Sequence, residues 1–322
     1  MGDDRNTKPL RVFLWIVPRV NSTAMTKCLS FMDDTVVWME PYMTCRLNET
    51  MYNPDFKKGD PAAEKMRENF ARLNKMEEVI TFMTEMDRKA KEHDNIFEQE
   101  VFLFPWVKTQ LEADEPGKKY IFIKDQACAI NEHLESLPEN VPTRHCFLIR
   151  HPGEVYPSLK NMAAHSSNPL GKPVPWDECH AANELPYLPV EDLFKIQYEL
   201  WKYVKEHLDP DTIILDGHDL ASNPDVMLPK FLEKLGVPYK ESYLQWPGDE
   251  ELVFSSWKGS VQTVIMAAQM IATSRAVQST QFDPPRNKRG FSKPEWKITD
   301  ELKQFVEKSL PYYEEMFANR LI

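Results

Sequence analysis

Several features that would assign a protein class at once are missing from this chain of 322 residues. No stretch approaches the ~20 consecutive apolar residues of a membrane-spanning helix. The N-terminus "MGDDRNTKPL" is acidic and polar, unlike a secretory signal. The five cysteines are scattered and form no CxxC pair, which argues against a disulfide framework and a zinc site. These absences predict a cytoplasmic protein without a membrane segment or bound metal, with a flexible N-terminus over residues 1–10.

Positive charge is also scarce, since 39 Lys and Arg residues stand against 50 Asp and Glu residues, for a net charge of −11. An acidic protein of this kind is not a general nucleic-acid binder, so any basic cluster must be local. The sequence GxxxxGK[ST] is absent as well, which argues against an ATP- or GTP-hydrolysing protein and against a small-molecule kinase.

Short apolar runs alternate with helical patterns along the whole chain. The runs predict strands at 11–17, 35–39, 120–124, 145–149 and 212–216, and the patterns predict helices at 62–93, 191–208 and 225–235. Gly236 is a typical helix C-cap, and long surface loops are expected at 166–190 and 283–294. This alternation predicts an α/β fold in which a central parallel sheet carries helices on both faces, without a clear domain boundary.

The first strand leads into the polar segment "VPRVNSTAM". Arg19, Asn21, Ser22 and Thr23 follow the apolar run and precede a helix-like stretch. Unpaired N–H groups and the dipole at a helix start attract anions, and Arg19 adds a full positive charge. The alternative is that Ser22 is only an N-cap and Arg19 a solvated surface residue.

A second segment, "FLIRHPGEVYPSL", repeats this arrangement. A strand ends at Arg150, and Ser158 follows eight residues later in a predicted helix. The forked guanidinium suits phosphate, although an Arg at a strand end and a Ser on a solvated helix face are also common. Because ligands of open α/β sheets bind at the C-terminal strand ends, we expect the two loops to lie side by side there and to hold a ligand with two anionic ends.

A third basic segment is "PPRNKRGF", which includes Arg286, Lys288, Arg289 and Gly290. Such a run is typical of a solvated loop. In a protein with an acidic balance, it is also able to fold over a polyanionic ligand.

These segments resemble motifs of the sulfotransferases that use 3′-phosphoadenosine-5′-phosphosulfate (PAPS). "VPRVNSTAM" resembles their phosphosulfate loop P-[KR]-S-G-[TS]-T, "FLIRHPGEVYPSL" their 3′-phosphate motif, "IFIKD" the strand that delivers a catalytic lysine, 214–247 a late segment of the family, and "KRG" their Arg-Lys-Gly. The resemblance spans about 11–318. It implies a three-layer α/β sandwich of the P-loop nucleotide-kinase-like sulfotransferase kind, a single domain over 1–322, and transfer of a sulfuryl group from PAPS.

The resemblance also implies which residues bind the donor. Carried over by position, the 5′-phosphosulfate is held by Arg19, Val20, Asn21, Ser22, Thr23 and Ala24, and the 3′-phosphate by Arg150 and Ser158, with Lys288, Arg289 and Gly290 as helpers. PAPS is then the co-substrate, 3′-phosphoadenosine-5′-phosphate (PAP) the product, and no metal takes part.

Two departures from the family pattern concern the loop and the base. Val20-Asn21 replaces the usual Ser-Gly, which removes a hydroxyl and stiffens the loop. The cytosolic enzymes carry Lys-Thr-His where this chain has Lys124-Asp125-Gln126, so the usual histidine base is missing. We expect Arg19 and Lys124 to flank the transferred group, unless Lys124 only extends from a strand end to water.

The candidate bases are Glu40, Asp125 and His151. Glu40 ends the strand 35–39, which we expect beside the first strand, and "MEPY" resembles a Glu-Pro found in some sulfotransferases. The alternatives are a salt bridge for Glu40, a salt bridge or helix cap for Asp125, and a place near the 3′-phosphate for His151.

The predicted acceptor is a small, lipophilic molecule with a hydroxyl group, such as a steroid, an alcohol or a phenol. The other function that fits the motifs is a nucleotide-binding protein of the same fold without catalysis. The sequence leaves the oligomeric state open.

Overall fold

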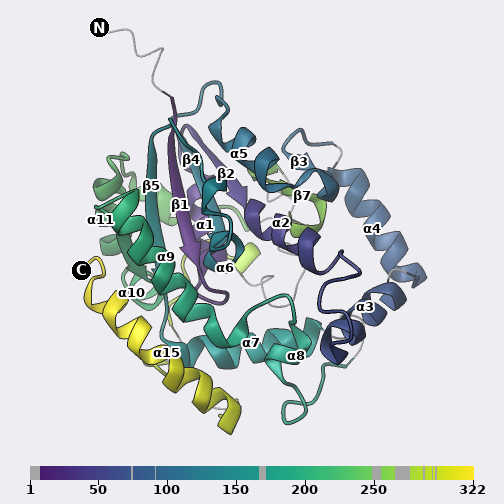
Figure 1. The fold of residues 1–322 in the computed structure, drawn as a ribbon. Helices are drawn as coiled ribbons and strands as arrows, with labels where there is room; N and C mark the ends of the chain where they lie inside the picture. Colours follow the sequence, from purple (N-terminus) through teal and green to yellow (C-terminus); the bar gives the residue numbers. More distant parts are fainter. Residues whose placement is uncertain are drawn as a thin grey trace, which may run out of the picture.

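A seven-stranded parallel sheet forms the centre of the protein (Figure 1). The computed structural model describes residues 8–73, 75–90, 92–166, 172–248, 255–264, 276–285, 287–291, 293 and 296–322. The strand order is β3-β7-β2-β4-β1-β5-β6, and every neighbouring pair is parallel. The strands are β1 (Leu10–Ile16), β2 (Thr35–Met39), β3 (Ile96–Phe97), β4 (Tyr120–Gln126), β5 (Thr143–Ile149), β6 (Ile213–Asp216) and β7 (Trp257–Ser260).

Helices cover both faces of this sheet. On one face α1 packs against β2 and β4 while α11 packs against β6; on the other, α2 and α6 pack against β4, and α15 packs against β5 and β6. The α-helices are α1 (Ser22–Ser30), α2 (Pro41–Thr50), α3 (Pro61–Leu73), α4 (Glu77–Ala90), α5 (Phe104–Glu112), α6 (Ala127–Ile130), α7 (Pro152–Ser166), α8 (Ala181–Glu184), α9 (Leu193–His207), α10 (Gly217–Ser222), α11 (Pro224–Leu235) and α15 (Asp300–Ala318). Short 3-10 helices are η1 (Gln99–Val101), η2 (Leu134–Ser136), η3 (Val190–Asp192) and η4 (Glu241–Leu244). The predicted α/β architecture with a central parallel sheet is confirmed.

The five predicted strands are all present, but β3 and β7 were not predicted. β3 is two residues long, and β7 has the sequence "WKGS", which lacks an apolar run. The single helix predicted over 62–93 is wrong, because α3 and α4 are separate, and Lys75 and Met76 belong to neither helix. Gly236 is the C-cap of α11 with φ of 70°, as expected.

Three irregular segments differ from their predicted extents or lie partly outside the described residues. The proposed flexible N-terminus is too long, since Leu10 already belongs to β1; residues 1–7 lie outside the described residues. The expected loop 166–190 contains the short helix α8, and its residues 167–171 are outside the described part of the chain. Arg286 of the third basic segment is outside it too.

The predicted neighbour of β2 is wrong. β2 does not pair with β1, because β4 lies between them and pairs with both, Lys124 standing opposite Leu14 on one side and Met39 on the other. Parallel strands are joined by crossovers, so order along the chain does not fix order in the sheet. The C-terminal ends of β1, β2 and β4 still meet at one edge of the sheet.

The sheet core explains the apolar runs. Residues 12–17 are at most 2% exposed, as expected for a strand covered on both faces. All five cysteines are free and buried, so they are core thiols. Among the described helices, none combines the length and hydropathy needed to cross a bilayer.

A buried histidine belongs to this core. Trp15 donates its Nε1–H to Nδ1 of His145 at 3.0 Å, and the imidazole stacks on Phe13 with ring centroids 5.2 Å apart. Burial lowers the pKa of His145 from 6.5 to about 4, against the opposing effect of Asp209. The imidazole is therefore neutral at pH 7 in the folded protein.

The lowered pKa of His145 predicts a loss of stability in mild acid. Between pH 6.5 and about 4 the unfolded chain binds a proton on this residue and the folded chain does not, so the free energy of unfolding falls as the pH falls. We expect His145 to contribute on the order of 1–3 kcal/mol to that fall. Denaturant unfolding at pH 7, 6, 5 and 4.5 measures it. His145→Gln, which can still accept from Trp15, should show a flatter dependence, and equal slopes in the two proteins would contradict the assignment.

Candidate active site

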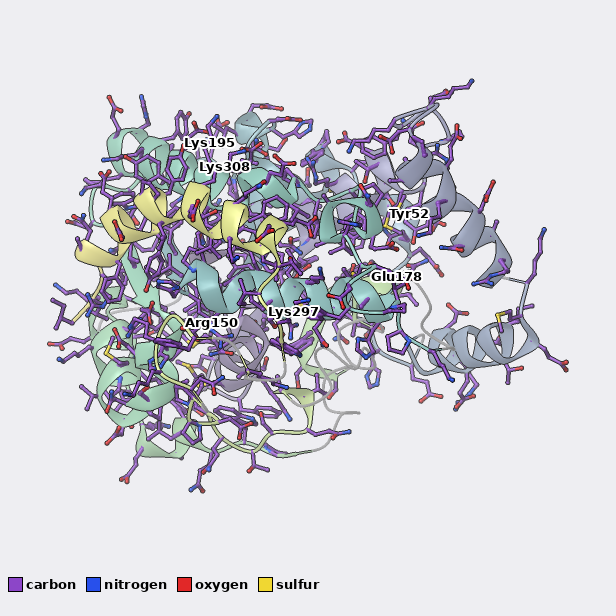
Figure 2. All side chains as sticks on the ribbon, turned by 90° about the horizontal axis from the view of Figure 1, so that it is seen from below. Tyr52, Arg150, Glu178, Lys195, Lys297 and Lys308 are labelled. Carbon is purple, nitrogen blue, oxygen red and sulfur yellow. The ribbon has the colours of Figure 1, made fainter. Side chains whose placement is uncertain are left out.

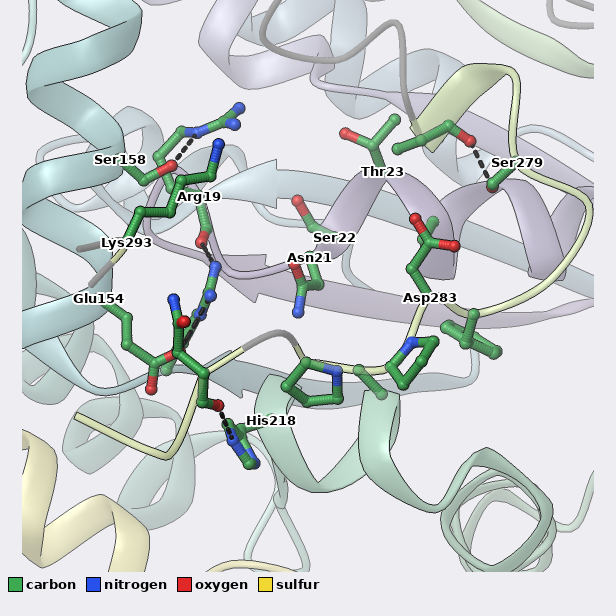
Figure 3. A pocket seen from close by; sticks show the side chains of 18 of the residues that line it. Arg19, Asn21, Ser22, Thr23, Glu154, Ser158, His218, Ser279, Asp283 and Lys293 are labelled. Atoms are coloured by element: carbon green, nitrogen blue, oxygen red, sulfur yellow. Dashed lines mark hydrogen bonds and ion pairs between the residues drawn. The ribbon is translucent and has the colours of Figure 1, made fainter. Parts of the chain in front are cut away.

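The C-terminal ends of β1 and β5 open into a cavity of about 400 Å³ (Figure 3). Its walls come from the loop after β1 with the start of α1, from α7, from α10 and from the described residues between 276 and 296. In Figure 2, Arg150 lies in the half of the molecule that holds α15, whereas Tyr52 lies in the half with α3 and α4. Because the cavity lies at the C-terminal ends of β1 and β5, it is where the sequence predicts that a ligand of an open α/β sheet binds.

The loop after β1 has an unusual backbone. Arg19 and Asn21 adopt left-handed conformations, with φ of 73° and 67°. Asn is among the few residues that adopt this conformation readily. The Nδ2 of Asn21 donates to the carbonyl oxygen of Gly217 at 3.2 Å. The strained conformation of Arg19 is of a kind that gathers at functional sites.

Helix α1 begins at the cavity wall. Its N-cap is Asn21, whose side chain makes no capping hydrogen bond, and Ser22, Thr23 and Ala24 of its first turn line the cavity. The interpretation of Ser22 as a mere N-cap is therefore wrong, because Ser22 is already helical. The backbone N–H groups of an uncapped first turn are suited to bind an anion.

Two arginines meet on this wall. Arg150 donates from Nη1 to the carbonyl oxygen of Arg19, and Arg19 donates from Nε to Oγ of Ser158, each at 3.0 Å. The prediction that the two loops lie side by side is thus confirmed. Burial and then the charge of Arg150 lower the pKa of Arg19 to about 10, so Arg19 remains a cation at pH 7. A bound anion would offset their mutual repulsion.

Three charged residues that line the cavity were not predicted from the sequence: Glu154, Asp283 and Lys293. Glu154 is 4% exposed and accepts hydrogen bonds from Nε of Arg150 and from the backbone N–H of Gly290, both at 2.9 Å. Figure 3 shows Lys293 on the same side of the cavity as Arg19 and Ser158. The spacing of Glu154, four residues after Arg150, was a usable signal for an ion pair.

The third basic segment lines the cavity through uncharged residues such as Asn287 and Phe291, and not through the residues that the resemblance implies. Among the described residues that line it, Lys288, Arg289 and Gly290 do not occur, nor does Val20, which is fully buried. Arg289 instead forms ion pairs with Asp216 and Asp219.

A second polar cluster lies at the ends of β2 and β4. Lys124 forms an ion pair with Oε1 of Glu40, and Gln126 donates from Nε2 to Oε2 of the same carboxylate at 3.1 Å. Glu40 has a φ of 50° and is the N-cap residue of α2. The salt-bridge alternative for Glu40 is therefore observed, and none of these three residues lines the cavity. Arg19 contacts Ser158 and Lys124 contacts Glu40, so the structure does not join Arg19 to Lys124 directly.

Asp125 is fully buried and holds the start of α2. Its carboxylate accepts hydrogen bonds from the backbone N–H groups of Tyr42, Met43 and Gln126 at 2.6–3.1 Å. Burial and the charge of Glu40 raise the pKa of Asp125, while the three backbone donors oppose the shift. These contacts favour the helix-cap alternative for Asp125 over a role as base.

The imidazole of His151, the third candidate base, also has partners within the protein. Its Nδ1 accepts a hydrogen bond from the backbone N–H of Gly153 at 3.0 Å, and its ring packs edge-on against Tyr313. The described residues contain no group of three or more His, Cys, Asp or Glu side chains placed to hold a metal ion.

Comparisons with known proteins give similarity only at the level of structure. No protein-family model matches the chain, and no curated protein matches it. A sulfotransferase domain from the curacin biosynthetic pathway matches with a TM-score of 0.49 and 15% identity, over 94% of this chain and 98% of that chain. A sulfotransferase domain from the Synechococcus PCC 7002 olefin synthase matches with a TM-score of 0.49 and 12% identity, over 100% and 98%. Likenesses of this size assign no activity, and the function proposed below rests on residues of this chain.

The left-handed backbone at Asn21 predicts how this loop tolerates substitution. Asn21→Gly and Asn21→Val both remove the hydrogen bond to Gly217, but only Val places a β-branched side chain at φ of 67°. We expect Asn21→Val to be less stable than Asn21→Gly by about 1–2 kcal/mol. Denaturant unfolding of the two variants measures this difference, and equal stabilities would show that the backbone of the loop relaxes.

Proposed function

We propose that this protein is a sulfotransferase that moves a sulfuryl group from PAPS to a hydroxyl group of a small, lipophilic acceptor such as a steroid, an alcohol or a phenol. One observation carries the proposal. The two segments that resemble the donor-binding motifs lie on adjacent strands and join through Arg19, Arg150 and Ser158 in one cavity.

The cavity offers two places for anionic groups. The uncapped start of α1, with Ser22 and Thr23, suits the 5′-phosphosulfate, and Arg150 with Ser158 suits the 3′-phosphate. Arg19 contacts Ser158 and lies between these two places in the chain of hydrogen bonds, so it can serve either group. A volume of about 400 Å³ is within the range of small-molecule sites.

The reaction depends on alignment and on charge. The acceptor oxygen forms a bond to sulfur as the bond from sulfur to the phosphate oxygen breaks; PAP leaves with the bonding electrons, and the acceptor proton passes to a base. Cations beside the leaving oxygen stabilise the charge that develops there. Lys124 stabilises the leaving oxygen once it leaves its ion pair with Glu40 and contacts the donor instead. The freed carboxylate of Glu40, at the same strand ends, then accepts the proton of the acceptor hydroxyl.

The acceptor class rests on the sequence alone. Large apolar side chains near the motifs, such as Met43, Trp246 and Trp257, are at most 5% exposed and belong to the core, so they do not define an acceptor pocket. The five free cysteines fit a reducing compartment such as the cytoplasm.

A second candidate is a nucleotide-binding protein without catalysis. The observation that favours it is the engagement of both oxygens of Glu40, by Lys124 and by Gln126, with Gln126 in the place of the family's histidine. Such a protein would bind PAP and transfer nothing.

The two candidates are separated by incubation of the protein with sulfur-labelled PAPS and a panel of alcohols, phenols, steroids and amines. Transfer of label to a hydroxyl acceptor supports the enzyme. Tight binding of PAP without transfer to any acceptor supports the binding protein, and the absence of PAP binding contradicts both.

Arg150→Ala tests the 3′-phosphate site. Loss of a charged hydrogen-bonding partner costs on the order of 1.5–3 kcal/mol, so the affinity for PAP should fall more than tenfold. The affinity for adenosine 5′-monophosphate, which has no 3′-phosphate, should change less. Calorimetry measures both, with Arg144→Ala at the opposite end of the same strand as the matched control. Equal losses for the two nucleotides would remove Arg150 from 3′-phosphate recognition.

Glu40→Gln tests the base. The substitution keeps the shape of the side chain and removes its basicity, so turnover should fall about 10²–10⁴-fold with PAP affinity nearly unchanged. Lys124→Ala should likewise lower turnover more than PAP affinity. Glu49→Gln on the same helix is the matched control. If Glu40→Gln retains most of its activity while Asp125→Asn loses it, the base is Asp125 in spite of its role as a cap.

A further inference from the structure

We propose that Arg289 is a positioning residue rather than a ligand of the nucleotide. It anchors the loop 287–291 to Asp216 and Asp219, so that the backbone N–H of Gly290 holds Glu154 and Glu154 in turn orients Arg150. The binding measurements that test this relay rest on the function proposed above.

The first link is the acidic anchor at the end of β6. Arg289 donates from Nη1 to Asp216 and from Nη2 to Asp219. Asp216 is fully buried and also accepts from the hydroxyl of Tyr313 at 3.2 Å. The guanidinium lies over the ring of Phe317 in α15, 4.7 Å from its centroid. These contacts hold Arg289 against β6, α10 and α15, and Arg289 is not among the described residues that line the cavity.

The second link is a close approach of two glycines. Gly290 has a φ of 82°, and a Cβ added there would stand 3.3 Å from the ring of His151. A Cβ on Gly153 would stand 2.7 Å from the carbonyl oxygen of Gly290, closer than real Cβ atoms come. Because both residues lack a side chain, the loop rests directly on the first turn of α7. This contact brings the Gly290 N–H to Oε1 of Glu154 at 2.9 Å.

The third link is the buried carboxylate of Glu154. Its other oxygen, Oε2, accepts from both Nε and Nη2 of Arg150 at 2.9 Å. These two contacts fix the orientation of the Arg150 guanidinium, and its Nη1 donates to the carbonyl oxygen of Arg19. Figure 3 shows Glu154 on the cavity wall below Arg19, with His218 nearby. His218 adds a further tie to the loop, since its Nε2 lies 3.3 Å from the carbonyl oxygen of Asn287.

The relay predicts an effect of opposite sign from that of direct binding. In Asp219→Asn the anchor of Arg289 loses charge. If Arg289 were a phosphate ligand for which Asp216 and Asp219 compete with the nucleotide, this variant would bind PAP as tightly as the wild type or more tightly. If Arg289 positions the loop, Asp219→Asn should weaken PAP binding, by about three- to tenfold. Arg320→Met, which removes the other ion pair of Asp219 and leaves that of Arg289, is the matched control with less than about a twofold change.

A double-mutant cycle tests whether the effect passes through Arg150. Arg289→Met should weaken PAP binding about tenfold in the wild type but less than about twofold in Arg150→Ala, because the group being positioned is then gone. Arg289→Lys should restore part of the affinity, since it keeps one ion pair. Losses that multiply independently in the double variant would overturn the relay.

A measurement without ligand separates failure of the relay from failure of the proposed function. Hydrogen exchange of the Gly290 amide should be slow in the wild type and in Arg320→Met, and fast in Arg289→Met and Asp219→Asn. If the wild type binds no PAP but this pattern holds, the relay stands and the proposed function fails. If the amide stays protected in Arg289→Met, the anchor is not Arg289 and the relay is wrong.

Discussion

The guanidinium of Arg150 links the parts of the site, because it joins the ends of β1 and β5 to α7 and, through Glu154, to the loop 287–291. It donates to the carbonyl oxygen of Arg19 after β1 and to the carboxylate of Glu154 in α7, which also holds Gly290. The left-handed backbone of Arg19 is thereby supported from the neighbouring strand. Among the described residues that line the cavity, the cations Arg19, Arg150 and Lys293 outnumber the carboxylates Glu154 and Asp283, in a protein with a net charge of −11. Such local charge favours an anionic ligand without making the whole surface attractive to polyanions.

The strands that are apolar runs could be predicted from the sequence, whereas the polar edge strand β7 and the order of the strands in the sheet could not. The runs at 11–17 and 145–149 correspond to the central strands β1 and β5, because a strand covered on both faces must be apolar throughout. The four residues of β7 include a lysine and a glycine and carry no such pattern. The position of β4 between β1 and β2 depends on how the crossovers pack, which no local pattern records.

The site divides in the same way between local and distant contacts. Arg19, Arg150 and Ser158 come together as predicted, because both turns follow parallel strands and must meet at one edge of the sheet. The ion pairs of Arg289 could not be predicted from the sequence, because its partners Asp216 and Asp219 lie about 70 residues away. A run of cations indicates a basic loop, but only the fold decides which of its charges are consumed by acids of the same chain.

The cluster at Glu40 shows why residue type alone does not identify a base. Asp125 and Glu40 are both carboxylates near the ends of neighbouring strands, yet their surroundings differ. The oxygens of Asp125 are engaged by three backbone N–H groups, and two of these, those of Tyr42 and Met43, cannot leave without loss of the first turn of α2. The partners of Glu40 are two side chains, Lys124 and Gln126, which can rotate away. A carboxylate acts as a base only if a lone pair is released when the acceptor arrives. An anionic donor that draws Lys124 away would release a lone pair of Glu40. If no such donor reaches Lys124, the same cluster is a structural ion pair.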